Sequence, residues 1–130
     1  MEDRYLFKAK DCNSIWRAGL LIGLQECRCA IEEKDGSKWA CNSKTICQCT
    51  GLKDKNGKLI WENDVVGFWD TYSTENGQAE MDCIGKVVWD DETISFQVTN
   101  RLSAESYEVL DECSVIGNIF DNPELLESEG

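Results

Sequence analysis

The sequence contains no histidine among its 130 residues. Without histidine, neither a Ser–His nor a Cys–His nucleophile pair can form. Glu62 and Asp64 would share one face of an extended strand and could bind a divalent cation or act as acid and base. Both carboxylates are more simply interpreted as residues of a turn and a strand start. We therefore expect a protein that is not an enzyme and that uses no cofactor.

Long apolar segments are missing as well. The longest, from Ala18 to Leu24, is far shorter than the roughly 20 residues that span a bilayer. The start of the chain, Met1 to Tyr5, lacks the apolar core of a secretion signal. We expect no membrane association and a location in the cytoplasm of the host cell.

Charge is present in quantity but is unevenly distributed. Residues 1–50 carry eight Lys or Arg against seven Asp or Glu, a balance of +1, whereas residues 51–130 carry five against eighteen, a balance of −13. Such a field repels nucleic-acid phosphates and attracts basic partners. We expect no direct nucleic-acid binding, although an acidic surface that only keeps the protein soluble explains the same count.

Cysteine is unusually common, with eight residues, and includes two Cys-x-Cys pairs: Cys27 with Cys29 and Cys47 with Cys49. Within a strand, both members of such a pair project to the same face. If the two strands were neighbours, the four thiols could bind zinc tetrahedrally. The more common role of such cysteines is that of small buried apolar residues, which is the interpretation we favour.

The hydrophobic pattern predicts a mainly β protein of short antiparallel strands. Asn56-Gly57 predicts a tight turn in which both residues tolerate a positive φ, and Ile94, Phe96 and Val98 alternate with polar residues as in a half-buried strand. Polar loops are expected around residues 32–37 and 73–80. The predicted strands are residues 4–9, a strand within 15–29, and 45–50, 65–69, 84–89, 93–99 and 115–120.

Two parts are expected from this pattern. Residues 1–50 would form a β-rich N-terminal part and residues 51–130 an acidic SH3-like β-barrel, the two packing as one compact unit. Asn122 followed by Pro123 predicts a short helical turn near the C-terminus.

Two sequence blocks resemble a known family. The stretch from Gln48 to Val66 is similar to the YopX signature Q-Y-T-G-L-x-D-x-x-G-x-x-I-[YFW]-E-G-D-I-V, and Val115 to Leu126 is similar to its ending V-I-G-N-I-[YF]-x-N-P-E-L-L. Cys49 replaces an aromatic residue and Asn63 a glycine. The signature residues that we consider candidates for interaction are Thr50, Gly51, Leu52, Asp54, Gly57, Trp61, Glu62, Asp64, Gly117, Asn118, Asn122 and Pro123.

The resemblance implies a small β-rich protein of bacteriophages and prophages whose biochemical activity is not established. We expect a non-enzymatic module that binds a host or phage protein and that itself forms a homo-oligomer. The second hypothesis is an acidic inhibitor whose carboxylates imitate DNA phosphates on a host defence or DNA-processing protein. A small-molecule or metal-binding protein is the third.

Overall fold

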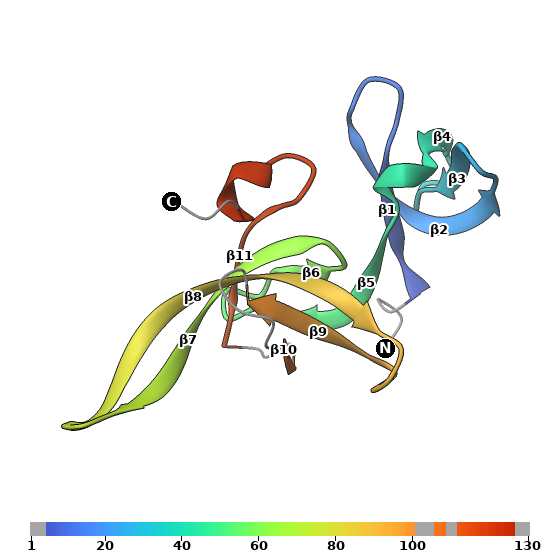
Figure 1. Cartoon of the computed structure of the whole chain (residues 1–130). Helices are drawn as coiled ribbons and strands as arrows, with labels where there is room; N and C mark the ends of the chain where they lie inside the picture. The colour runs from blue at the N-terminus through green and yellow to red at the C-terminus, as the bar shows by residue number, and fades with distance from the viewer. Residues whose placement is uncertain (1–4, 101–105, 109–111, 127–130) are drawn as a thin grey trace. The chain divides into compact units, whose positions relative to one another are not determined.

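The protein is built almost wholly from antiparallel strands (Figure 1), as the sequence predicts. The computed structural model describes residues 5–100, 106–108 and 112–126. The chain divides into two compact units, Met1–Gly51 and Leu52–Gly130. No helix in the described residues is long and apolar enough to cross a membrane.

The first unit is a meander of short strands with a small core. Its strands follow the order β4-β3-β2-β1-β5, and a bridge between Asp11 and Cys41 also brings the end of β1 to β4. Ala9, Cys29, Ile31 and Cys41 form the buried core. The elements are β1 (Phe7–Lys10), β2 (Trp16–Leu24), β3 (Arg28–Glu32), β4 (Lys38–Asn42), the 3-10 turn η2 (Ser43–Thr45) and β5 (Cys47–Lys53), after which β6 follows in the sheet order.

The second unit centres on a sheet in the order β10-β9-β8-β7-β11. Ile60, Val66, Val87, Val98 and Cys113 form its buried core. The order is linear and the described residues show no closure between β10 and β11, so the SH3-like barrel stays a prediction. The elements are β6 (Leu59–Trp61), β7 (Asp64–Thr74), β8 (Gly77–Asp90), β9 (Ser95–Asn100), β10 (Ser106–Glu108), β11 (Ser114–Asn118) and the 3-10 turn η3 (Pro123–Leu126).

Strands β7 and β8 extend past their neighbours as a two-stranded arm, which is visible in Figure 1. β11 pairs with β7 only as far as Gly67, and β9 pairs with β8 only from Gly85 onward. The β7–β8 register continues to Thr74 opposite Gly77. We call residues 68–84 the arm.

Two details of the predicted second part are wrong. The polar loop expected at residues 73–80 is replaced by the tip of the arm, where strand pairing continues to Thr74. Polar residues indicate exposure to water, and both a loop and an exposed β-hairpin are exposed to water, so composition did not distinguish between them. Ile94 does not continue the alternation of Phe96 and Val98, because it lies in the turn before β9 with φ of 52° and is 75% exposed.

Candidate functional site

Asp54 is a buried signature residue whose carboxylate binds backbone groups. Its Oδ1 accepts hydrogen bonds from the N–H groups of Asn56 and Lys58, both at 2.9 Å, and its Oδ2 accepts from the N–H of Val115 at 2.9 Å. Burial by itself raises the pKa of this carboxyl, but the three N–H donors outweigh burial and hold the pKa below its usual value. The anion therefore fastens the 54–58 turn to β11.

The turn that Asp54 organises differs from the prediction in one respect. Gly57 has φ of 81°, whereas Asn56 does not adopt a positive φ. The N–H of Gly57 donates to the carbonyl of Asp54 at 3.0 Å, and the N–H of Asp54 donates to the carbonyl of Lys58 at 2.8 Å. Because Asp54 supplies the side-chain acceptor, a single left-handed residue is enough to reverse the chain.

Asp64 has a similar structural role at the start of β7. It is 2% exposed, and its Oδ2 accepts from the N–H of Trp61 at 2.8 Å. Asn63 lies just before it with φ of 71°, a conformation that glycine and asparagine adopt most readily. This explains why asparagine can occupy a position that is glycine in the family signature. Glu62 and Asn63 form a turn before β7, so the extended stretch that would place Glu62 and Asp64 on one strand face is interrupted there, and the structural interpretation of both residues is favoured.

The second signature block forms a compact loop after β11. Asn118 Oδ1 accepts from the N–H groups of Phe120 and Asp121 at 3.0 and 2.9 Å, and Asn122 Oδ1 accepts from the N–H of Asn118 at 3.3 Å. A Cβ on Gly117 would lie 2.5 Å from Asn122 Oδ1, so a side chain there would displace the Asn122 amide that accepts from the N–H of Asn118. The predicted turn is present as η3 and begins at Pro123.

The remaining signature residues are distributed along β5 and β6. Thr50 is buried, Gly51 has φ of 81°, and Leu52 is 46% exposed on β5. Trp61 is half-buried at the end of β6, and Glu62 follows it in the turn. These residues lie on β5, β6 and the turn after β6. Among the described residues they form no group that could hold a metal ion.

The two Cys-x-Cys pairs do not come together. Strands β2 and β1 lie between β3 and β5 in the sheet order, so the pairs are not on neighbouring strands as a four-thiol site would require. Cys27 lies outside β3 and is exposed, while Cys47 and Cys49 are buried in β5. Within the ranges that the structure describes, no group of three or more Cys, Asp or Glu side chains is placed to bind a metal ion.

Cys29 instead faces Cys41 directly across the β3–β4 ladder, a pairing that could not be inferred from the sequence. Burial raises the pKa of the Cys29 thiol. Burial, followed by the neighbouring Cys29 and Asp11, raises the pKa of Cys41 to about 11. Both thiols are therefore protonated at neutral pH and act as core residues, because only a thiolate is a good nucleophile or ligand.

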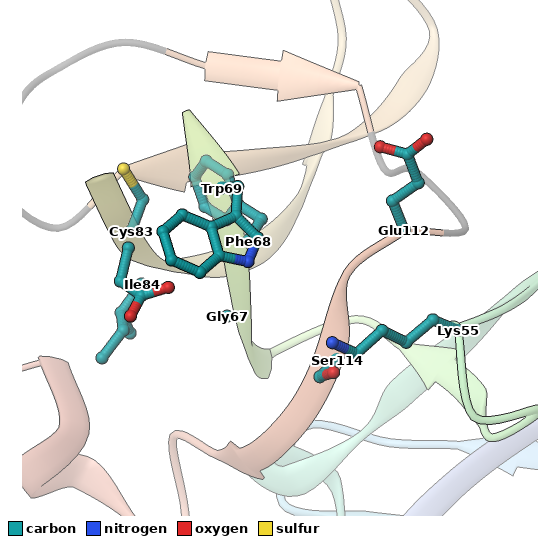
Figure 2. A pocket seen from close by; sticks show the side chains of 9 residues that line it. Lys55, Gly67, Phe68, Trp69, Cys83, Ile84, Glu112 and Ser114 are labelled. Atoms are coloured by element: carbon teal, nitrogen blue, oxygen red, sulfur yellow. The ribbon is translucent and has the colours of Figure 1, made fainter. Parts of the chain in front are cut away.

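A hollow that the sequence did not reveal lies at the base of the arm. Its volume is about 250 Å³, and Figure 2 shows Phe68, Trp69 and Ile84 on one side, with Lys55, Ser114 and Glu112 on the other. Asp82 and Cys83 of β8 also line it, together with Gly67, which contributes no side chain. Trp69 is 63% exposed, and Asp82 and Glu112 are exposed as well. In the sequence, the one indication of this hollow is that Trp69 is followed by mostly polar residues.

Trp89 provides a contrast with Trp69 inside the same unit. It is 44% exposed, but its Nε1 donates to Asp91 Oδ1 at 2.9 Å and its ring meets Phe96 edge-on at 5.0 Å. Trp69 projects from the arm beside the hollow and exposes more of its ring. Of these two tryptophans, Trp69 is the better placed to contact another molecule.

The sequence was compared with known proteins and with models of protein families. No curated protein matches the chain. The model of one protein family, described as YopX protein, matches residues 7–127, which is most of the chain and includes both units. The chain therefore belongs to the YopX protein family.

Proposed function

We propose that this protein acts without catalysis, by binding another protein, as an accessory factor of a bacteriophage or prophage. The polar signature groups support a non-catalytic role, since Asp54, Asp64 and Asn118 direct side-chain oxygens to backbone N–H groups. Side chains held in this way stabilise turns. We therefore look for the binding function in the exposed residues of the second unit, and not in these turn-forming side chains.

The observation that carries the proposal is the exposure of Trp69 beside a hollow at the base of the arm. Tryptophan is enriched among the residues that dominate binding energy at protein interfaces. The hollow, at about 250 Å³, lies below the roughly 300–1,000 Å³ that is usual for small-molecule sites. This size favours a side chain of a protein partner over a separate small ligand.

Site-specific photo-crosslinking tests the proposal in bacterial cells. A photoreactive amino acid replaces exposed Lys55, which lines the hollow, and a matched protein carries it at exposed Lys38 of β4. We expect the Lys55 position to capture a protein that the Lys38 position does not, and Trp69→Ala to abolish the capture. Equal products from both positions, or none, would contradict the proposal.

The acidic inhibitor is the second candidate, because the second unit carries a balance of −13. Asp54 and Asp64 are buried and cannot imitate phosphates, so the exposed carboxylates such as Asp91 and Glu92 would have to do so. A captured partner that releases the protein when duplex DNA is added would support this candidate. If added duplex DNA leaves the capture unchanged, the result supports the interaction module and not the inhibitor.

A further inference from the structure

We propose that the β7 edge of the arm docks an extended, arginine-bearing segment of a partner protein. The segment would add a strand antiparallel to β7, in line with β11, and place an arginine over Trp69. This inference rests on the proposed function, to which it adds the class of partner and the binding mode.

The first support is the unfinished edge of β7. β11 pairs with β7 from Asn118 opposite Asp64 to Ser114 opposite Gly67. From Trp69 to Thr74, the only strand that pairs with β7 among the described residues is β8. An edge strand presents N–H and C=O groups to which an extended peptide can hydrogen-bond. A two-stranded hairpin alone is only marginally stable, so a third strand would also stabilise the arm.

The second support is the position and lining of the hollow. It lies at Gly67 and Ser114, where the β7–β11 pairing stops, so the C-terminal end of an incoming strand would lie beside it. A guanidinium can stack on the face of Trp69 while its aliphatic stem contacts Ile84. The carboxylates of Asp82 and Glu112 can then accept hydrogen bonds from the guanidinium.

The third support is charge complementarity. Every charged residue between Phe68 and Ile84 is acidic, namely Asp70, Glu75, Glu80 and Asp82. Among the described residues that line the hollow, Lys55 is cationic whereas Asp82 and Glu112 are acidic. A second copy of this chain would bring an arm of the same sign, which electrostatics disfavours. A basic segment of a different protein fits the edge better.

Binding of synthetic peptides to the full chain tests the inference directly. The probe is a fluorescent peptide of alternating arginine and valine, measured by fluorescence anisotropy. The two control peptides carry glutamate in place of arginine, or N-methyl groups on alternate backbone nitrogens. We expect each control peptide to bind about tenfold more weakly, because one loses charge complementarity and the other loses strand pairing.

Protein variants assign the binding to this edge. Trp69→Ala should weaken the arginine peptide about tenfold, as for an interface residue that dominates binding. Gly67→Ala fills the floor of the hollow, yet its Cβ would keep ordinary contacts of 3.9 Å to Cys83 O and 4.0 Å to Ile116 Cγ2, so the fold is kept. It should weaken the peptide several-fold. Trp89→Ala and Asp91→Asn are the matched controls outside the arm and should leave the affinity unchanged.

Several outcomes would overturn the inference. They are equal binding of the arginine and glutamate peptides, full binding of the N-methylated peptide, an unchanged affinity of Trp69→Ala, and a concentration-dependent dimer that Trp69→Ala abolishes. If the Lys55 crosslink succeeds while the arginine peptide does not bind, the inference fails and the proposed function stands. If neither is seen, both fail.

Discussion

The two units each fasten a turn to the fold with a buried aspartate, but the aspartates have different partners. In the first unit, Asp11 Oδ1 accepts from the N–H groups of Asn13 and Ile15, and Oδ2 binds Arg17 Nε at 2.8 Å. The Arg17 guanidinium also lies 3.5 Å from the ring centre of Trp39. In the second unit, Asp54 binds three backbone N–H groups.

The charge balance of each unit offers a reason for this difference. Residues 1–51 have a balance of +1, so a guanidinium is available as a counter-ion in the first unit. Residues 52–130 have a balance of −13, and the buried carboxylate is instead stabilised by backbone dipoles, which every non-proline residue provides. The acidic surface and the folded core of the second unit can therefore coexist, because the core does not depend on scarce cations.

The largest expected effects come from one close-packed glycine in each unit. A Cβ on Gly19 of β2 would collide with the backbone carbonyl of Glu32, and a Cβ on Gly85 of β8 would lie 2.6 Å from Thr99 O. Gly19→Ala and Gly85→Ala should each lower the free energy of unfolding by about 3 kcal/mol, because strand backbones must separate. Denaturant unfolding followed by tryptophan fluorescence measures this.

Each close-packed glycine has a control on its own strand or on the strand paired with it. A Cβ on Gly23 would lie 3.7 Å from Ala30 Cβ, and one on Gly67 makes only ordinary contacts, so alanine at either site should change stability little. If the units unfold separately, Gly19→Ala shifts one transition and Gly85→Ala the other. Alanine at the two close-packed sites behaving like alanine at the controls would contradict the strand spacing described here.

The next effect concerns Asp54 and pH. Asp54→Asn should cost about 2 kcal/mol at neutral pH, because an amide cannot accept all three N–H bonds of a buried carboxylate. The folded pKa of Asp54 lies below its unfolded value, so its contribution is present above the unfolded pKa of about 3.9 and is lost as pH falls through the folded pKa. The difference in stability between the native sequence and Asp54→Asn should therefore shrink in acid below about pH 4.

Salt separates the two aspartates in the same experiment. The destabilisation by Asp11→Asn should decrease as salt rises, because the Arg17 ion pair is partly accessible, with Arg17 20% exposed. The destabilisation by Asp54→Asn should stay constant, because its acceptors are bound by backbone N–H groups. A difference for Asp54→Asn that grows in acid would show that its pKa is raised in the fold.

The smallest expected effect on stability concerns the thiols. Of the eight cysteines, Cys12 and Cys27 are exposed, and both belong to the first unit and line one hollow. A thiol reagent added to the native protein should modify these two rapidly and the other six only after unfolding. Cys12→Ser with Cys27→Ser should remove the rapid phase with little change in stability, and a remaining rapid phase would contradict the burial of the other six thiols.

Much of the strand pattern could be predicted because it depends on local rules. The turn at Gly57, the strand around Val65–Trp69 and the turn at Pro123 follow from glycine, β-branched residues and proline acting on their own neighbourhood. The second strand of the β3–β4 hairpin was not predicted. Its sequence from Lys38 to Asn42 has few β-branched residues, and pairing with β3 is what makes it a strand.

The candidate site was less predictable than the fold. The signature pointed to Asp54, Asp64 and Asn118, which are buried or engaged in turns, whereas the surface we propose for binding involves Trp69, Asp82 and Glu112. The last three are far apart along the chain. Only the register of β7 with β8 and the end of the β7–β11 pairing bring them to one hollow.

The sequence by itself determined the mainly β class, the family and the concentration of acidic charge after residue 50, because composition, turn residues and motif spacing are local properties. The tertiary structure decided which cysteines are neighbours, which carboxylates are buried, and where a strand edge is left without a partner in the described part of the chain. Those properties depend on which strands pair and in which register, and pairings such as that of β11 with β7 join residues about 50 positions apart.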